Sequence, residues 1–481
     1  MWNSLSSFII KFRVLFLIFI AVVTFFMAQN AVNVEYSVER AKILPSSHQV
    51  FLDNQNFQNK YGNNQVMAIA ISDSLFFNID RFLFWDSLCA EIKKINGVEN
   101  IISVNNLSKL EKNLEEKKFE TSKWFDDTLL NQETLDSLVI ELNKQKFYDG
   151  FFNDNNDGAL VLIDLDSEIV ISKNRDNLVF SIKEISEIYS KKYNTRIHYS
   201  GMPYMRSVQS VSLKKEILLF IFLTLFITSL ILYLFFRSFK AMFVSVIVVV
   251  VGVIFAFGLI EVLDYKITLL TALVPPVLIV IGIPNCIFLI NKFHNEYRKN
   301  NNKIKSLKIM IGKIGNITLL TNVTTATGFA AFLLTNSQSL QEFGLIASIN
   351  ILVIYTLSLC LIPIFFSFFS PPKPNHTKHL DRKWVVSIVD YLIFLVNNKR
   401  SAIYTVTIIA LLFSIFGLSK MNLTGNLSDD FNKRDALYKD LKYFENKYKG
   451  VLPLEILVDT KKKNGLFKSY NLKKMEELSS L

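Results

Sequence analysis

Cysteine is scarce in this chain of 481 residues, which contains only three. Cys89, Cys286 and Cys360 lie far apart, and two of them fall inside long apolar segments. Thiols scattered in this way form neither a disulfide framework nor the close spacing of a metal site. The sequence therefore predicts no metal centre and no cofactor, and it shows no nucleophile and base set that would indicate an enzyme.

Carboxylates are missing from the middle of every long apolar segment. Intramembrane acids serve as proton carriers because burial raises their pKa toward neutrality. The sequence therefore gives no support for proton coupling through this part of the chain.

Apolar residues, in contrast, are abundant: they make up 51% of the chain, Phe alone numbers 42, and the mean hydropathy is +0.30. Five long apolar segments follow one another at about 216–236, 241–262, 267–291, 316–335 and 343–369. Each approaches the roughly 20 residues that cross a bilayer as a helix, and the gaps between them are mostly too short to hold a domain. We therefore predict that residues 213–369 form a five-helix membrane bundle.

The formal charge of +11 could indicate nucleic-acid binding, so the positions of the basic residues decide the question. They gather in three gaps between apolar segments, at 237–240, 292–313 and 373–400. All three gaps fall on one side of the membrane if the segments alternate, whereas the opposite gaps carry few basic residues. This asymmetry predicts that the three gaps face the cytoplasm and that no nucleic acid is bound.

The amino-terminal region has an apolar run, residues 14–28, which follows Lys11 and Arg13. A cleaved signal peptide has a similar length, but apolar residues ahead of Lys11 extend the run. We therefore predict an uncleaved first transmembrane helix with a short cytoplasmic start, residues 1–32. Residues 33–212 are polar and mixed in charge, and they are numerous enough for a domain outside the cytoplasmic membrane.

Strand-like and helix-like patterns alternate within residues 33–212. Strands are predicted at about 66–71, 159–165 and 196–199, and helices at about 79–95, 132–143 and 175–193. This alternation predicts an α/β domain of the split βαβ, ferredoxin-like type.

Two acidic features of this domain could be read as sites. Asp164 and Asp166 share one face at strand spacing, but no His, Cys or Ser group accompanies them, so a polar strand end is favoured over a catalytic pair. Residues 153–158 resemble a calcium loop superficially, but the expected Glu is missing, so we predict a hairpin turn.

The fourth predicted transmembrane helix, formed by the apolar segment 267–291, contains Pro275, Pro276, Gly282, Pro284 and Asn285. A proline inside a helix removes one hydrogen bond and clashes with the carbonyl four residues earlier. The segment is therefore predicted to be kinked or locally unwound near the middle of the membrane. Broken helices of this kind often mark transport sites, although proline kinks are also common in purely structural membrane helices.

The fifth predicted transmembrane helix, formed by the apolar segment 316–335, is polar for its depth and includes Thr321, Asn322 and Thr325. Thr321, Thr325 and Gly328 recur at helical spacing, which predicts a stripe of small residues on which another helix packs closely. A polar lining is the alternative. The candidates for a transport path or a hinge are therefore Thr321, Asn322 and Thr325, together with the five residues named in the fourth predicted transmembrane helix.

The carboxyl-terminal third continues the membrane pattern. Residues 370–400 form a basic linker with the spacing of an amphipathic helix at the inner interface, and 401–420 a seventh transmembrane helix. Residues 57–62, Phe-Gln-Asn-Lys-Tyr-Gly, return as Phe-Glu-Asn-Lys-Tyr-Lys-Gly at 444–450. We therefore expect 421–481 to be the incomplete start of a second external domain, and the chain alone to export little.

Four stretches carry a resemblance to a known family: Phe235–Ser238, Leu269–Pro276, Thr321–Phe332 and Glu342–Ala347. They resemble the resistance-nodulation-division (RND) superfamily, specifically the MMPL-like exporters that share a sterol-sensing-type five-helix unit with Patched-like proteins. The resemblance implies twelve helices, two periplasmic porter domains, usually an oligomer, and a place in the inner membrane. It also implies proton-driven export of lipids or other hydrophobic or amphiphilic compounds.

One departure from the family pattern lies in the fourth predicted transmembrane helix. Proton-driven relatives usually place an Asp where this sequence has Pro284 and Asn285. Because Asn cannot titrate, we expect a hinge or polar contact here rather than a proton carrier. Two other classes stay open: a sterol-sensing-type membrane sensor or scaffold, and a protein-export accessory subunit of the SecD/SecF type. The start of a second external domain favours the exporter.

Overall fold

The computed structural model describes residues 2–36, 48–61, 65–113, 118–125, 131–142, 144, 158–371, 383–421, 433–448, 458, 460, 465 and 468–479. The chain divides into two compact units. The first comprises Met1–Gln65, Asp166–Phe180 and Pro203–Leu427, and the second comprises Val66–Leu165, Ser181–Met202 and Ser428–Leu481.

Within the described residues, seven helices are long and apolar enough to cross a membrane. They are α2 (Arg13–Asn33), α8 (Met202–Phe236), α9 (Phe239–Val262), η3 (Thr271–Leu273) with α10 (Val274–Asn300), α11 (Lys303–Ala330) with η4 (Ala331–Leu334), α12 (Gln338–Phe368) and α15 (Arg400–Ser419). Each predicted apolar segment contains one of these helices, and the chain is a polytopic helical membrane protein.

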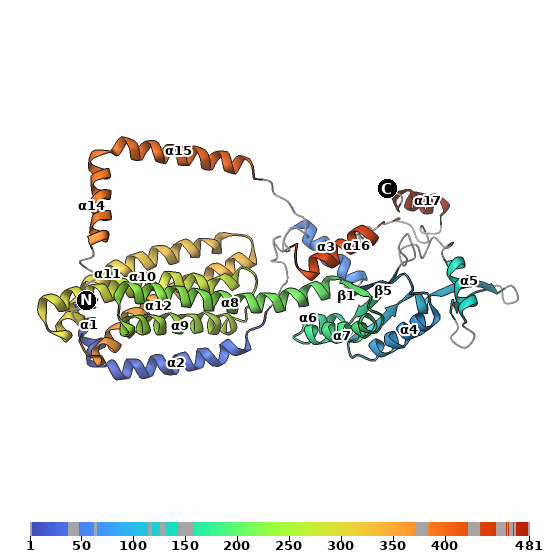
Figure 1. Ribbon diagram of the computed structural model, residues 1–481, viewed down its shortest axis with the longest axis horizontal. Helices are drawn as coiled ribbons and strands as arrows, with labels where there is room; N and C mark the ends of the chain where they lie inside the picture. The colour runs from blue at the N-terminus through green and yellow to red at the C-terminus, as the bar shows by residue number, and fades with distance from the viewer. Residues whose placement is uncertain are drawn as a thin grey trace. The chain divides into compact units, whose positions relative to one another are not determined.

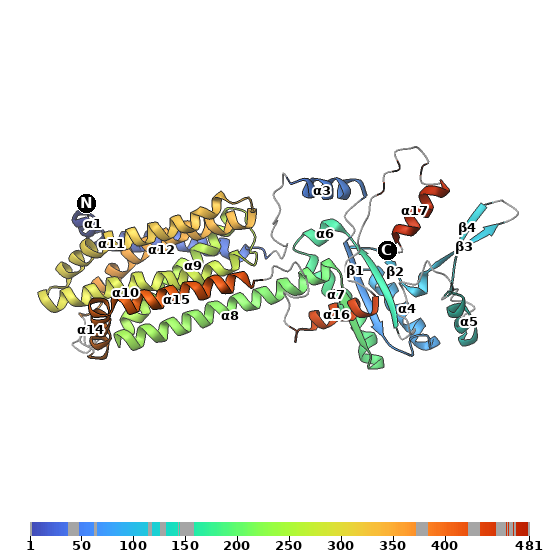
Figure 2. The same cartoon turned by 90° about the horizontal axis from the view of Figure 1, so that it is seen from above.

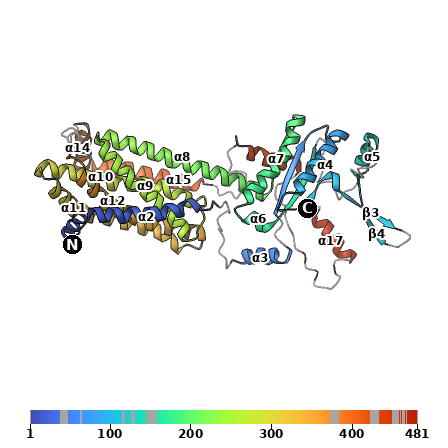
Figure 3. The same ribbon diagram turned by 90° about the horizontal axis from the view of Figure 1, so that it is seen from below.

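Helices α9, α10, α11 and α12 run side by side and share one apolar core (Figure 1). Ile354 of α12 is fully buried, and its δ-methyl lies 2.6 Å from where a Cβ at Gly282 would stand. Helix α2 packs on α9 (Figure 3), where a Cβ at Gly258 would stand 2.6 Å from the carbonyl oxygen of Met27. Glycine therefore permits two close helix contacts in this bundle.

Two shorter helices accompany the bundle. Helix α1 (Trp2–Lys11) is separate from α2 and packs against α11, where the Trp2 ring covers Gly315. Helix α14 (Lys383–Asn398) forms where the amphipathic helix was expected. Its place at the inner interface stays a prediction, and residues 372–382 of the same linker lie outside the described residues.

The start of α10 and the effect of its prolines differ from expectation. Helical structure starts at Thr271 rather than at about 267, because Ile267 forms a bridge with Tyr36 instead. Pro275 and Pro276 occupy the first turn of α10, where the missing N–H groups have no helical partner in any case. The helix continues without interruption through Pro284, so the alternative of local unwinding is wrong, whereas the alternative of a kink stays a prediction.

The second unit contains a four-stranded sheet in the order β2-β5-β1-β6 (Figure 2). Its strands are β1 (Gln65–Ser72), β2 (Val98–Ile102), β5 (Gly158–Leu165) and β6 (Arg196–Ser200). Helix α4 (Ile79–Lys93) links β1 to β2, and α7 (Arg175–Tyr193) lies between β5 and β6 in the sequence. The two strands of each β–α–β segment are thus separated by a strand of the other segment.

The remaining elements are shorter. They are α3 (Gln49–Tyr61), η1 (Val104–Asn106), the hairpin strands β3 (Ser108–Asn113) and β4 (Lys118–Lys123), α5 (Gln132–Leu142), α6 (Ser167–Ile171), α16 (Ala436–Tyr448) and α17 (Ser469–Ser479). Sequence patterns did not predict the hairpin. Helices α3 and α16 both have 13 residues and end at the repeated tyrosine, which agrees with the expected repeat. The repeat itself stays a prediction.

Two further features involve ionisable groups in or next to the strands of the sheet. Asp166 caps α6 by accepting the backbone N–H of Glu168 at 2.7 Å, whereas Asp164 stays within β5. They serve different local roles and do not form a pair. Asp440 of α16 lies 2.8 Å from Nδ1 of His198 in β6, and both side chains are buried. Residues 153–157 of the expected hairpin turn lie outside the described residues.

Candidate transport site

The candidate residues of α10 and α11 meet at one polar contact inside the bundle. The Asn285 amide donates to the Asn322 side-chain oxygen at 3.0 Å, and Asn322 donates back at 2.9 Å. Asn322 also donates to the carbonyl of Thr318 at 2.7 Å. Asn285 is 4% exposed and Asn322 2% exposed, so the contact is closed to its surroundings.

This reciprocal pair satisfies a physical requirement of the apolar bundle. A buried amide without hydrogen bonds carries a large desolvation cost, and water is not available at this depth to compensate for it. Both N–H groups of Asn322 are occupied, one by Asn285 and one by its own helix. The pair therefore links α10 to α11, and neither side chain can exchange a proton near neutral pH.

The glycine and prolines of α10 occupy different surroundings. Gly282 is buried against Ile354, one turn before Asn285. Pro275 is buried and Pro276 half-buried, whereas Pro284 is exposed although it directly precedes Asn285. The structure therefore buries Gly282 and Asn285 within the bundle and leaves Pro284 at its surface.

The threonine stripe of α11 faces away from the bundle. Thr321 is exposed and Thr325 half-buried, and their hydroxyls donate to the carbonyls of Ile317 and Thr321 on the same helix. Nothing lies within 4 Å of where a Cβ at Gly328 would stand. Among the described residues, the close packing expected on this stripe is not formed.

A buried acid that sequence reasoning missed lies farther along α10. Glu296 is 5% exposed and contacts Lys292 at 3.0 Å and Lys313 of α11 at 3.5 Å. It lies eleven residues beyond Asn285, which corresponds to about 16 Å along a helix. Glu296 therefore belongs to the basic end of α10 rather than to the middle of the bundle.

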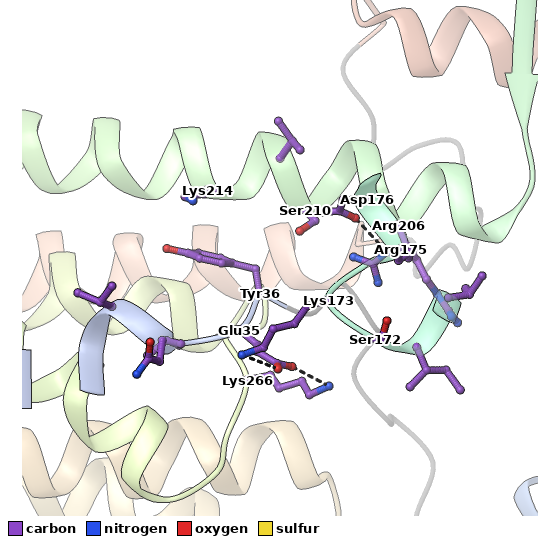
Figure 4. Close-up of a pocket in the computed structure, with 16 residues that line it drawn as sticks. Glu35, Tyr36, Ser172, Lys173, Arg175, Asp176, Arg206, Ser210, Lys214 and Lys266 are labelled. Carbon is purple, nitrogen blue, oxygen red and sulfur yellow. Dashed lines mark hydrogen bonds and ion pairs between the residues drawn. The ribbon is translucent and has the colours of Figure 1, made fainter. Parts of the chain in front are cut away.

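The first unit also contains a charged cavity of about 480 Å³, which we call the basic pocket (Figure 4). Its lining comes from the end of α2, the junction of α6 and α7, the start of α8 and the segment after α9. The charged residues of the lining are Glu35, Lys173, Arg175, Asp176, Arg206, Lys214 and Lys266.

Glu35 joins three of these segments. Its carboxylate oxygens lie 3.1 Å from Lys173 and 3.2 Å from Lys266, and its carbonyl accepts the N–H of Ile267 at 2.7 Å. Burial alone would raise the pKa of Glu35, but the hydrogen bonds and the attraction of the two lysines outweigh it and lower the pKa. The carboxylate is therefore charged at neutral pH and holds both lysines in place.

Sequence reasoning did not select the basic pocket, although a signal for it was present. Lys214 and Lys266 adjoin apolar segments on the side predicted to be poor in basic residues. Membrane orientation does not explain basic residues on this side, so their presence indicates another role. Their convergence with Lys173, which lies in a distant part of the sequence, could be seen only in the folded chain.

These features define the class of protein as a polytopic helical membrane protein. It has a buried polar contact inside its helix bundle and a charged pocket at the ends of its helices. The sequence pattern of the MMPL family matches residues 91–391, which is more than half of the chain. The chain therefore belongs to the MMPL family, and this membership indicates an RND-type membrane transporter. No curated protein matches the chain.

Proposed function

We propose that this protein exports lipids or other hydrophobic or amphiphilic compounds across or out of the cytoplasmic membrane. The observation that carries the proposal is the family match over residues 91–391, which includes helices α8 to α12. The same membership supports a role that is not enzymatic and that requires no cofactor.

We further propose that the α/β unit is a porter domain on the periplasmic side of the inner membrane. Its strand order has the split βαβ character expected of such a domain. The placement of basic residues in the gaps at 237–240, 292–313 and 373–400 supports this orientation. The partners in this proposal are the bilayer, the transported compound and further copies of the protein, with no nucleic acid.

The asparagine pair supports a particular role for α10 in the proposed transport. An amide cannot carry a proton, so α10 acts as a hinge or a fixed polar contact, and any coupling acid resides elsewhere. The same pair favours one second candidate, a sterol-sensing-type sensor or scaffold, because that function needs no titrating group in the bundle.

Reconstitution of the purified protein with a fluorescent phospholipid in liposomes tests the proposal. The measured quantity is the rate at which labelled phosphatidylglycerol leaves the inner leaflet, followed by chemical bleaching of the outer leaflet over a range of pH. In line with the expectation that the chain alone exports little, the protein should accelerate this movement over protein-free vesicles by a small but measurable amount. Asn285→Leu should slow it at every pH without shifting the pH profile, because the pair does not titrate.

Asn316→Leu is the matched control, because Asn316 is an exposed asparagine on α11 outside the pair. It should leave the rate unchanged. A folded protein that binds the lipid without moving it would contradict transport and support the sensor. A pH profile that shifts in Asn285→Leu would overturn the role given to the pair.

A further inference from the structure

The basic pocket carries a surplus of positive charge. Among the described residues of its lining, five side chains are cationic and two are carboxylates, which gives these residues a net charge of +3. Glu35 contacts two of the cations, and Asp176 lies 3.1 Å from Arg175. Among the described residues, no carboxylate lies within ion-pair distance of Lys214, whose ammonium lies 5.8 Å from the Tyr36 ring centroid. The pocket therefore attracts anions.

The depth of the pocket matches that of lipid headgroups. Lys214 lies one turn before the exposed Leu218, where the apolar surface of α8 begins, and the residues from Val32 to Tyr36 line the pocket where α2 ends. Apolar spans end where the hydrocarbon core meets the headgroup layer. A charged group of a lipid in this layer can therefore reach the pocket while its chains stay in the bilayer.

The size and lining of the pocket fit a headgroup. Its volume of about 480 Å³ falls within the roughly 300–1,000 Å³ of small-molecule sites. Val170, Ile171 and Val211 supply an apolar part of the lining beside the cations. A phosphate group fits this combination because it bears concentrated negative charge and several acceptor oxygens, which lysine and arginine bind strongly.

We propose that the basic pocket binds the phosphate-bearing headgroup of an anionic amphiphile, with Lys214, Lys173 and Arg206 contacting the phosphate. The pocket would then select the substrate class of the transporter, and in that respect the inference rests on the proposed function. Binding itself does not depend on transport, so the two can fail separately.

Calorimetric titration of the purified full chain in detergent tests the pocket with short-chain lipids of one acyl length. Dihexanoyl phosphatidic acid should bind, and the zwitterionic dihexanoyl phosphatidylcholine should bind at least about tenfold more weakly. Inorganic phosphate distinguishes a free anion from a headgroup, and it should not displace the lipid at equal concentration.

The variants use two neighbouring lysines as a matched pair. Lys214→Gln removes a charge from the lining and should weaken binding of phosphatidic acid about tenfold, whereas Lys214→Arg should retain it. Lys215→Gln removes the same charge at the same depth but outside the lining, and it should bind like the unchanged protein.

Three results would overturn the inference: equal binding of the two lipids, equal effects of Lys214→Gln and Lys215→Gln, or displacement of the lipid by an equal concentration of inorganic phosphate. If binding fails while labelled phospholipid still moves in liposomes, the pocket proposal falls and the proposed function stands. If binding succeeds without movement, the pocket stands and the transport proposal falls.

Discussion

At the scale of single residues, the asparagine pair shows how polar groups are accommodated in the bundle. Asn285 and Asn322 exchange hydrogen bonds from two adjacent helices, and each side chain is almost fully buried. Either amide alone would be left in an apolar setting with an unsatisfied group. The two residues therefore depend on each other for stability.

We expect this dependence to appear in a double-mutant cycle. Asn285→Leu and Asn322→Leu should each destabilise the protein, and the double variant should lose less than the sum of the two. The coupling should be about 0.6 kcal/mol and at most about 1.7 kcal/mol, the average and the maximum measured for hydrogen bonds between membrane helices. Unfolding in mixed micelles measures it. Asn316→Leu serves as the exposed control, and additive effects of the two replacements would contradict the pairing.

The Glu35 cluster predicts a pH-dependent loss of stability. The folded-state pKa of Glu35 is lowered below the ordinary value of 4.5, so its contribution is complete above that value and is lost as pH falls through the lowered pKa. Glu35→Gln should cost on the order of 1 kcal/mol at pH 7, because both ion pairs are partly exposed, and progressively less below pH 4.5. Melting temperatures at several pH values measure this difference.

The matched control for Glu35 is Glu216→Gln, since Glu216 is an exposed acid at the start of the apolar part of α8. It should change the melting temperature little at any pH. If Glu35→Gln remained as destabilising at pH 3 as at pH 7, the ion pairs would not be the cause.

At the scale of helices, glycine sets the contact between α2 and α9. A Cβ at Gly258 would stand 2.6 Å from the carbonyl oxygen of Met27 and 2.9 Å from its Cα. These are backbone atoms, so a rotamer change cannot relieve the contact and the helix must move. The bundle keeps α2 in place through this close approach.

Gly258→Ala should therefore destabilise the bundle by about 1–3 kcal/mol, which is typical of overpacking. Gly328→Ala makes the same change in a membrane helix where nothing lies within 4 Å, and it should be neutral or stabilising by up to about 1 kcal/mol. Thermal unfolding in detergent compares the two variants. Similar losses of stability in both variants would show that the added methyl group acts through something other than the Met27 contact.

At the scale of the whole molecule, the predicted orientation places the basic α10–α11 connection in the cytoplasm and residues 33–212 outside. Introduced cysteines can test this orientation, because the native thiols should react little with a labelling reagent. Cys89, Cys286 and Cys360 are all buried, and burial raises the pKa of the Cys89 thiol to about 12. The native thiols should therefore react slowly at neutral pH.

A membrane-impermeant maleimide should label Ser74→Cys in intact cells and Lys305→Cys only after the membrane is permeabilised. Both positions are exposed, so a difference in labelling reports the side of the membrane rather than burial. Gel-shift detection of the labelled protein measures the result. Labelling of Lys305→Cys in intact cells would invert the orientation.

The sequence by itself determined the membrane class, the positions of the spans and much of the α/β pattern. The length of an apolar run and its match to the bilayer are local properties, so the five segments of 213–369 could be found without knowledge of their neighbours. The same holds for the helix at 175–193, whose predicted bounds agree with α7. Periodicity identifies an element and its faces without reference to the fold.

Only the tertiary structure decided which residues meet. Asn285 and Asn322 were both selected from the sequence, but their pairing depends on how α10 packs beside α11. Glu35 lies far in sequence from Lys173 and Lys266, so no local pattern could place them together. Pro284 was expected to kink or locally unwind α10, and the helix continues through it without unwinding. Packing between segments distant in the sequence selects partners and stabilises local conformations, and these interactions are absent from any single stretch of sequence.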